Sequence, residues 1–276
     1  MVIQMKNKSC LVVLSGGQDS VTCLAWAKQQ YEVVHAVTFN YGQRHKIEID
    51  SARAVCEILN VDSHEIIDIP EILKSASPLI SENQLETYDN FEQMGEVIGN
   101  RVELTFVPMR NTLFLTIATN RAIELGCQHI ITGVCQQDNA NYPDCTNDFI
   151  HSLEKSFNKG LGISSLKIIT PLMYHTKAQS VKLALTIPKA MLALAYSHTS
   201  YDGDYPPINR NHATVLREQG FLEADIPDPL IVRACFDNLM NIPPLPNYNE
   251  ARKLLLFSKV TTTLQEILSK LYPKSC

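Results

Sequence analysis

The stretch that decides the fold lies at residues 10–27 and reads CLVVL, SGGQDS and VTCLAWA in succession. Residues 10–14 form a short apolar run, which is typical of a strand buried on both faces of a sheet. Residues 21–27 have the pattern of a helix. Gly16 and Gly17 therefore stand at the turn between a strand and a helix, where the backbone is left uncovered by side chains.

Apolar runs of the same kind recur along the chain, with helical patterns between them. The five predicted strands cover residues 10–14, 33–39, 64–69, 128–134 and 167–170. This alternation indicates parallel strands joined by right-handed crossovers. It predicts an α/β fold in which one five-stranded parallel sheet carries helices on both faces.

The Ser-Gly-Gly turn is predicted to bind phosphate. A strand that runs through such a turn into a helix presents several backbone N–H groups at the helix N-terminus, with no side chains to block an anion. The turn is not a Walker A loop, because no Gly-Lys-Ser/Thr follows, and it is not a Gly-x-Gly-x-x-Gly fingerprint. The alternative is an ordinary tight turn, in which glycine is the default residue.

Two helices are predicted in detail. The first covers residues 111–126, with Asn111 as its N-terminal cap and Gly126 at its end. Its apolar face consists of Leu113, Phe114, Ile117, Ala118, Ala122 and Leu125. The second covers about residues 43–59, and Asn60 closes it. Its inward-facing residues are Ile49, Ala52, Cys56 and Leu59.

The rest of the chain is less regular. The polar stretch between residues 71 and 101 shows no clear period, which predicts a long loop or lid. After residue 187 Pro, Asn and Asp become frequent, and helical spacing resumes over residues 248–272. This change predicts a nucleotide-binding domain at 1–187 and a small, mainly helical subdomain at 188–276.

Composition and charge narrow the class of protein. The chain has 276 residues, a net charge of −5 and 45% hydrophobic residues, and its pI is about 5.9. No basic stripe is present, so nucleic-acid binding is not expected. No membrane-spanning stretch or signal peptide is recognised, which predicts a cytoplasmic protein with no membrane partner. The eight cysteines include no Cys-x-x-Cys pair, which favours reduced thiols.

The hexapeptide SGGQDS resembles the phosphate loop of the ATP pyrophosphatases, the PP-loop enzymes that split ATP into AMP and pyrophosphate while they adenylate a substrate. Four further stretches are similar to the 7-cyano-7-deazaguanine synthase (QueC) family. They read VTFNYGQRHKIEIDSA, FVPMRNTLFLTIA, ITGVCQQDNANYPDCTNDFI and TPLMYHTKAQ, and the resemblance extends over roughly residues 9–230.

The resemblance implies a ligase reaction. Members of the family adenylate the carboxylate of 7-carboxy-7-deazaguanine, let ammonia attack to give the amide, and dehydrate the amide to the nitrile with a second ATP. The implied cofactors are ATP and Mg²⁺, and the implied assembly is a homodimer. We therefore expect ammonia or another amine as the second small-molecule substrate.

The chemistry needs a clamp for the triphosphate, cations near the phosphates and a polar pocket for a planar acid. The predicted catalytic residues are Asp19, for Mg²⁺ or loop geometry, and the cations Arg110 and Lys177. The predicted nucleotide-binding residues are Ser15, Gly16, Gly17, Gln18, Ser20, Phe39, Tyr41, Gly42, Gln43, Arg44 and Gly133. The predicted substrate-binding residues are Asp138, Tyr142, Pro143, Asp144 and Cys145.

Each of these assignments has a plainer alternative. Arg110 and Lys177 could be solvated surface charges, and Tyr41 could be a core aromatic residue. Asp144 could pair with the N–H groups of a guanine-like edge or belong to a Pro-Asp turn. Cys135, like Cys145, is expected to be a buried structural thiol rather than a nucleophile.

The chain departs from the family pattern at two groups of positions. Ser200, Ile208, Asn211 and Thr214 stand where the family has four zinc-binding cysteines, so we predict no structural zinc. His198 and His212 remain nearby and are expected to be ordinary hydrogen-bonding residues. Asn40, Met109, Gln136, Asn141 and Thr146 replace Asp, Gly, Glu, Gly and Arg. The loss of charge suggests either a changed acceptor or neutral drift.

Three alternatives to an ordinary synthase remain open. The first is a zinc-less paralog that couples the activated deazaguanine to an amine of a protein or another large acceptor, for which residues from about 237 onward could be a docking surface. The second is a non-catalytic scaffold that only holds a nucleotide. The third is another PP-loop enzyme, such as a tRNA thiolase, against which the acidic pI and the absence of a Cys-x-x-Cys pair argue.

Overall fold

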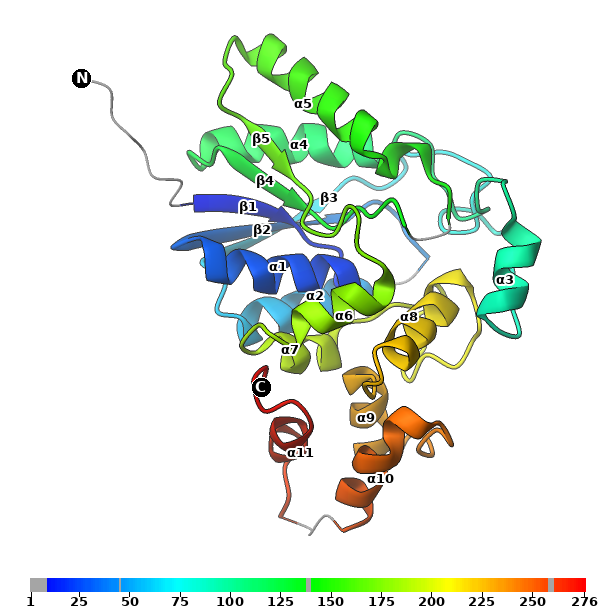
Figure 1. Cartoon of the computed structure of the whole chain (residues 1–276). Coiled ribbons are helices and arrows are strands. Elements are labelled where there is room, and N and C mark those ends of the chain that lie inside the picture. Colours follow the sequence, from blue (N-terminus) through cyan, green and yellow to red (C-terminus); the bar gives the residue numbers. More distant parts are fainter. Residues whose placement is uncertain (1–8, 45, 138–139, 258–260) are drawn as a thin grey trace.

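The computed structural model describes residues 9–44, 46–137, 140–257 and 261–276 and shows a parallel sheet between two layers of helices (Figure 1). The strands are β1 (Ser9–Val13), β2 (Val33–Asn40), β3 (Ser63–Asp68), β4 (His129–Thr132) and β5 (Lys167–Ile169). Their order in the sheet is β3-β2-β1-β4-β5, and all pairs are parallel. The prediction of a five-stranded parallel α/β sheet is confirmed.

The strand order reverses at β1. From β1 the chain builds one side of the sheet through β2 and β3, and then returns to place β4 on the other side of β1. In open α/β sheets a crevice forms at such a reversal, outside the carboxyl ends of the strands. The turn at residues 14–17 leaves β1 at this point.

Alternating side chains of β1 serve two cores. Cys10, Val12 and Leu14 belong to a large buried cluster on one face of the sheet. Leu11, which points the opposite way, belongs to a second cluster that includes Val37 of β2. Burial of both faces explains why the strand is an unbroken apolar run.

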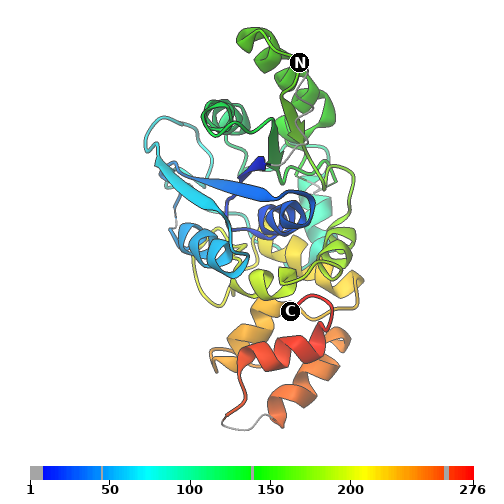
Figure 2. The same ribbon diagram turned by 90° about the vertical axis from the view of Figure 1, so that its left-hand side faces the viewer.

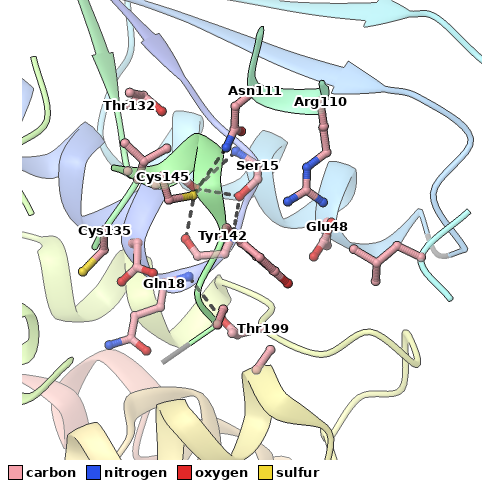
Figure 3. Close-up of a pocket in the computed structure, with 18 of the residues that line it drawn as sticks. Ser15, Gln18, Glu48, Arg110, Asn111, Thr132, Cys135, Tyr142, Cys145 and Thr199 are labelled. Carbon is pink, nitrogen blue, oxygen red and sulfur yellow. Dashed lines mark hydrogen bonds between the residues drawn. The ribbon is translucent and has the colours of Figure 1, made fainter. Parts of the chain in front are cut away.

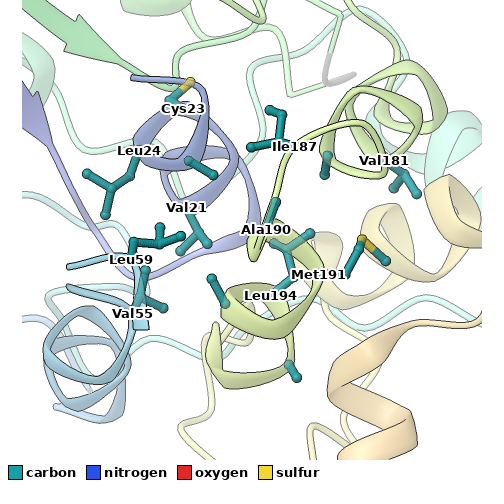
Figure 4. Close-up of a cluster of buried hydrophobic side chains, with 14 of the residues drawn as sticks. Val21, Cys23, Leu24, Val55, Leu59, Val181, Ile187, Ala190, Met191 and Leu194 are labelled. Atoms are coloured by element: carbon teal, nitrogen blue, oxygen red, sulfur yellow. The ribbon is translucent and has the colours of Figure 1, made fainter. Parts of the chain in front are cut away.

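Helices cover both faces, as predicted. On one face lie α1 (Gln18–Gln30), α2 (Ile47–Ile58), α6 (Lys177–Ala184) and α7 (Ala190–Tyr196). On the other lie α4 (Arg110–Glu124) and α5 (Asn147–Leu161), drawn above the sheet in Figure 1. Figure 4 shows Val21, Val55, Ile187 and Leu194 meeting in the core between α1, α2 and α7.

The details of the two predicted helices are partly corrected. α4 begins at Arg110, with Met109 at the N-cap position in a left-handed conformation, so the predicted capping by Asn111 is wrong. Leu125, which was placed on the apolar face, is 41% exposed. In α2, the four residues predicted to face inward are buried. Asn60 follows that helix with φ = 50°, which agrees with its predicted role.

The polar stretch at residues 71–101 contains a helix that the sequence pattern did not reveal, so the prediction of a loop is wrong there. This helix, α3 (Phe91–Ile98), is capped by Asn90, whose side chain accepts from the N–H of Gln93. Met94 packs with Val215 of α8 (His212–Glu223) in a third small cluster. The helix therefore lies against the C-terminal part of the chain (Figure 1).

The C-terminal part is helical, as predicted. Besides α8, it contains α9 (Pro229–Phe236), α10 (Asn249–Leu256) and α11 (Leu264–Leu271), together with the 3-10 turn η2 (Pro246–Tyr248). Figure 2 shows α10 and α11 at the end of the molecule opposite α5. Buried residues of α9 and α11 join the same cluster as α1 and α7. The boundary at residues 187/188 stays a prediction. Within the described residues, we find no helix with the length and hydropathy needed to cross a bilayer.

Candidate active site

A cavity of about 610 Å³ opens at the carboxyl ends of β1, β2 and β4 (Figure 3). Its walls come from the Ser-Gly-Gly turn and α1, the segment after β2, the start of α4 and the loop after β4. The fifth wall is the segment 198–201 with the first residues of α8. This volume lies in the range of small-molecule and cofactor sites.

The turn after β1, residues 15–20, which we call the phosphate loop, requires glycine at position 16. Gly16 has φ = 91°, a conformation that favours glycine. A Cβ at this position would lie 2.2 Å from the carbonyl oxygen of Glu48 at the start of α2. Gly17 has extended dihedral angles and forms the N-cap of α1, so its amide lies at the positive end of the helix.

Side-chain hydroxyls lock the phosphate loop in shape. The Ser20 hydroxyl accepts from the N–H of Ser15 at 3.2 Å and donates to the carbonyl of Gly17 at 3.0 Å. The hydroxyls of Ser15 and Ser20 are 3.0 Å apart. Gly133 at the end of β4 lets this helix start approach closely, because a Cβ there would lie 2.9 Å from the nitrogen of Ser20.

Gln18, the first residue of α1, is held by its backbone rather than by its side chain. Its N–H donates to the hydroxyl of Thr199 at 3.1 Å. Its side chain is only 2% exposed, lines the cavity, and makes no hydrogen bond within the part of the chain that the structure describes. A buried amide of this kind is costly unless another group satisfies it.

Lys177 and Asp19 form an ion pair at the cavity, with 2.6 Å between Nζ and Oδ2. Lys177 is the first residue of α6, which Thr176 and Gln179 begin with a capping box. The Lys177 side chain is 10% exposed, so the alternative of a solvated surface charge does not fit it. A cation held at the phosphate loop can neutralise the charge of a bound phosphate.

Arg110 lines the opposite wall, where Figure 3 shows its guanidinium close to Glu48. Burial raises the pKa of Glu48 to about 7, although the positive charge of Arg110 opposes this shift. Burial likewise raises the pKa of Tyr41, again against the effect of Arg110. Sequence reasoning missed Glu48, and the signal was its place inside one of the family-like stretches.

Aromatic rings form the wall on the β2 side. The rings of Phe39 and Phe114 are stacked, with 4.3 Å between centroids, and Tyr41 is tilted against Phe114 at 5.3 Å. Tyr41 is both a core residue and a lining residue, so the two readings of it are compatible. Gln43 lines the cavity and accepts from the N–H of Tyr41 at 2.9 Å.

Three other residues predicted to bind the nucleotide differ in whether they line the cavity. Arg44 lines the cavity, whereas Gly42, with φ = 82°, forms the turn beside it and is not among the lining residues. Gly16 is also absent from the lining, because it shapes the loop from behind.

The loop after β4 brings three of the predicted substrate-binding residues to the cavity, namely Tyr142, Pro143 and Cys145. Asp138 lies outside the described residues. Asp144 is 6% exposed, lies in the 3-10 turn η1 (Pro143–Cys145), and accepts from the N–H of Asn111 at 3.4 Å. Burial raises the pKa of Asp144, and Arg110 and Asn111 act in the opposite direction.

Asp144 therefore lies behind the wall rather than on it. Its contact with the start of α4 favours the structural reading of the Pro-Asp turn. Both cysteines line the cavity, but they differ in burial: Cys135 is buried and its thiol donates to the carbonyl of His175 at 3.2 Å, whereas Cys145 is half-buried. Cys145 accepts from the Asn111 amide at 3.4 Å.

A buried carboxylate behind Tyr142 was also missed. Glu103 is 2% exposed, and its side chain accepts from the N–H of Thr105 at 2.6 Å and from the hydroxyl of Tyr142 at 3.3 Å. The Thr105 hydroxyl contacts the carboxylate of Glu103 and the hydroxyl of Tyr142. The network fixes the ring of Tyr142 at the cavity wall.

The positions where the family has zinc-binding cysteines form a hydrogen-bonded corner. The Asn211 amide donates to Asp202 at 2.9 Å and to Ser200 at 3.4 Å, and its oxygen caps α8 by accepting from the N–H of Thr214. Ile208 is 68% exposed. Across the described ranges no group of three or more His, Cys, Asp or Glu residues could hold a metal ion. That the chain holds no structural zinc stays a prediction.

Comparison with known proteins decides the family. A sequence model described as "Queuosine biosynthesis protein QueC" matches residues 9–225. The chain belongs to the QueC family. A relative named 7-cyano-7-deazaguanine synthase from Gloeobacter violaceus is 45% identical over 81% of this chain and 95% of its own length. A protein of the same name from Laribacter hongkongensis is 44% identical over 81% of this chain and 94% of its own length.

The resemblance derived from the sequence motifs is thereby confirmed, and the chain is an ATP-dependent enzyme of the QueC type. Among solved structures, a 4-thiouridine synthetase–RNA complex with bound ATP matches with a TM-score of 0.44 and 19% identity. That match covers 77% of this chain and 50% of the other, and it carries no argument about function.

Proposed function

We propose that this QueC protein is a 7-cyano-7-deazaguanine synthase, which uses ATP to activate the carboxylate of 7-carboxy-7-deazaguanine. The observation that carries the proposal is the phosphate loop at the start of α1, with the Lys177–Asp19 ion pair beside it in one cavity. The names of the relatives support 7-cyano-7-deazaguanine as the product. The loop supports the use of a nucleotide.

The first half of the reaction joins the acid to ammonia. A carboxylate oxygen attacks the α-phosphorus of ATP, the bond from that phosphorus to the β-bridging oxygen breaks, and pyrophosphate leaves. The nitrogen of ammonia then attacks the acyl carbon of the adenylate. AMP leaves with its oxygen, the nitrogen loses a proton, and the amide forms.

The second half converts the amide into the nitrile. The amide oxygen attacks the α-phosphorus of a second ATP, and pyrophosphate leaves again. Loss of AMP and of both N–H protons gives the carbon–nitrogen triple bond of 7-cyano-7-deazaguanine. The same cavity serves both halves, because each half begins with the attack of an oxygen nucleophile on the α-phosphorus of an ATP bound there.

The phosphate loop and the cations have separate roles in this scheme. The amides after β1, with the hydroxyls of Ser15 and Ser20, bind the β- and γ-phosphates. Lys177 neutralises the leaving pyrophosphate, and Arg110 stabilises charge at the α-phosphoryl group from the opposite wall. A single carboxylate on the loop suits Mg²⁺, which binds proteins through one or two carboxylates and otherwise through phosphates and water. Asp19 would hold the ion, which would supply positive charge to neutralise the phosphates.

The remaining lining residues divide into two sides. We assign the adenine to the β2 side, with Phe39, Tyr41, Gln43 and Arg44, while Gly42 and Gly133 shape its backbone. We assign the deazaguanine to the loop after β4, which supplies Tyr142, Pro143 and Cys145, with Asp138 and Asp144 in the same loop. Glu103 orients Tyr142 from behind.

The test is an incubation of the protein with ATP, Mg²⁺, ammonium and 7-carboxy-7-deazaguanine, in which pyrophosphate release and product mass are followed. We expect two pyrophosphates and the nitrile per turnover. Asp19→Ala should abolish pyrophosphate release, whereas Asp50→Ala, which removes an exposed carboxylate on α2, should not. A wild-type protein that binds ATP without releasing pyrophosphate would instead be a nucleotide-binding scaffold.

We further infer from the family resemblance that the protein is a cytoplasmic homodimer. The same resemblance supports ammonia or another small-molecule amine as the acceptor. A protein acceptor stays the alternative. Pyrophosphate release that stops at one per product, with an amide adduct on a protein in place of the nitrile, would favour that alternative. Light scattering on the purified protein tests the assembly.

A further inference from the structure

A buried ion pair outside the cavity holds the wall that faces the phosphate loop. Arg217 of α8 and Asp228, the N-cap of α9, are 3% and 5% exposed. Two parallel hydrogen bonds join them, at 2.6 Å from Nε to Oδ2 and at 2.8 Å from Nη2 to Oδ1. Neither residue is among the described residues that line the cavity.

All five N–H donors of Arg217 find acceptors. Besides the two bonds to Asp228, Nη2 donates to the carbonyl of Leu194 at 3.2 Å, and Nη1 donates to the hydroxyls of Ser197 and Thr199, each at 2.9 Å. A guanidinium with every donor engaged in a planar fork has one orientation only. Arg217 therefore fixes the segment 197–199.

That segment holds the phosphate loop in two places. The N–H of His198 donates to the carbonyl of Gly16 at 2.9 Å. The hydroxyl of Thr199 accepts from the N–H of Gln18 at 3.1 Å. Both ends of the loop's turn are thus fastened to a segment whose position depends on Arg217.

The two bonds that Thr199 accepts decide what its hydroxyl can do. An alcohol oxygen has two lone pairs and one hydrogen. Arg217 and the N–H of Gln18 occupy the lone pairs, so the hydrogen is left to donate. Within the described part of the chain it donates to no group, and Thr199 lines the cavity, where Figure 3 shows it below the loop.

The contacts that run from Thr199 through Arg217 to Asp228 continue into the C-terminal part of the protein. Asp228 lies three residues beyond the region that the family model matches, which ends at residue 225. Its N–H donates to the hydroxyl of Tyr248 at 3.2 Å, and the buried hydroxyl of Tyr272 donates to the carbonyl of Pro227 at 2.7 Å. The C-terminal helices therefore fix Asp228 as Asp228 fixes Arg217.

We propose that Arg217 and Asp228 are positioning residues for nucleotide binding, which hold Thr199 so that it anchors the phosphate loop and donates its hydroxyl hydrogen to a phosphate oxygen. This inference rests on the proposed function, because it takes ATP to be the ligand. The proposal gives Asp228, which lies beyond the residues that the family model matches, a role in nucleotide binding.

The test measures the affinity of the full chain for ATP with Mg²⁺ by calorimetry, in the absence of acid and amine, together with KM for ATP in the complete reaction. Thr199→Val keeps the shape of the side chain and removes the hydroxyl, and we expect ATP affinity to fall on the order of 10-fold or more. Thr199→Ser should restore affinity to within about 3-fold of the wild type, since it restores the hydroxyl.

Asp228→Asn should raise both the Kd and KM for ATP on the order of 10-fold, because Arg217 loses its charged partner. The Asp228→Asn/Thr199→Val double variant should bind ATP no more weakly than Thr199→Val alone, since the two residues act in one chain of contacts. Thr263→Val is the matched control, because it removes the capping hydroxyl of α11 away from the cavity. It should lower the melting temperature and leave ATP affinity unchanged.

The outcomes separate this inference from the proposed function. Wild-type affinity in Thr199→Val would overturn the role of the hydroxyl. A lower melting temperature with unchanged ATP affinity in Asp228→Asn would make the ion pair merely structural and overturn its positioning role. If Asp228→Asn does not fold, Thr199→Val and Thr199→Ser decide. If the wild-type protein did not bind ATP, that result would instead contradict the proposed function itself.

Discussion

Replacement of Gly16 by alanine tests how the phosphate loop depends on its backbone. The new Cβ would lie 2.2 Å from the carbonyl oxygen of Glu48, and contacts below 3.0 Å essentially do not occur. The loop and the first turn of α2 would thus have to separate by about 0.8 Å. Both contacting groups are backbone, so no side-chain rotation can relieve the clash.

The magnitude follows from two costs. A non-glycine residue at φ = 91° is strained by about 1–2 kcal/mol, and forced overpacking costs about 1–3 kcal/mol more. Alanine also reduces the conformational freedom of the unfolded chain, which offsets about 0.4–1 kcal/mol of this destabilisation. We therefore expect a net loss of about 1–4.6 kcal/mol, which at roughly 3 °C per kcal/mol corresponds to a drop of roughly 3–14 °C in Tm. A misplacement of nearly 1 Å should lower kcat/KM for ATP by about 100-fold.

The assays are thermal unfolding by circular dichroism and pyrophosphate release. Gly160→Ala is the matched control, because a Cβ on that residue of α5 would meet nothing within 4 Å. It should stabilise the protein by about 0.5–1 kcal/mol and leave turnover unchanged. A Gly16→Ala protein that melts with the wild type and retains kcat/KM within about 3-fold would refute the reasoning from the close contact.

Three further predictions concern two residues of the cavity wall and the N-cap residue of α4. Lys177→Met should reduce pyrophosphate release by about 100-fold or more, since the cation beside the phosphates is lost; stopped-flow detection of pyrophosphate measures this, and near-normal turnover would remove Lys177 from the site. Met109→Gly should raise Tm by about 1–3 °C, because Met109 is 62% exposed and has φ = 64°; an unchanged or lower Tm in calorimetry would contradict the strain. Burial raises the pKa of Glu48 from 4.5 to about 7, so the folded state holds its proton more tightly than the unfolded state and stability is lost as pH rises through that window. Glu48→Gln should therefore gain stability relative to the wild type between pH 5 and about pH 7.5 in urea titrations, and parallel curves would show that the carboxyl titrates normally.

The sheet could be predicted from the sequence because its central strands, such as β1 and β4, are apolar runs buried on both faces. All five apolar runs became strands within three residues of the predicted ends. α3 was not found, since it is short and stands in a polar stretch, and only its cap at Asn90 and Gln93 signals a helix. Local pattern cannot show that Met94 will be buried by a helix more than a hundred residues later in the chain.

The site was predictable only in part for a similar reason. A loop that binds through consecutive backbone N–H groups requires a short contiguous motif, so the phosphate loop can be recognised from the sequence alone. Glu48 and Thr199 join the cavity through packing between elements, and no spacing rule connects them to the loop. The ion pair of Arg217 and Asp228 is harder still to predict from the sequence, because it acts on the phosphate loop only through the side chain of Thr199.

The departures from the family pattern bear on the choice between a synthase and a paralog with another acceptor. If the lost charges had been removed to admit a new acceptor, the substituting side chains should face the cavity with free hydrogen-bonding groups. Gln136, Asn141 and Thr146 do line the cavity, but each of them makes a hydrogen bond within the protein. Gln136 accepts from the N–H of Asn147 at 3.2 Å, and Asn40, which is not among the lining residues, donates to Asp68 at 2.6 Å.

The other two polar substitutions behave in the same way. Asn141 has φ = 52° and donates to the carbonyls of Gly99 and Arg101, and Thr146 caps α5 by accepting from the N–H of Phe149. Gln136, Asn141 and Thr146 bond to backbone groups, and Asn40 bonds to the side chain of Asp68, so each replacement has a partner within the fold, as neutral drift under the constraint of folding would produce. These four contacts favour the ordinary synthase over the paralog, because they supply a structural reason for residues that would otherwise call for a new substrate.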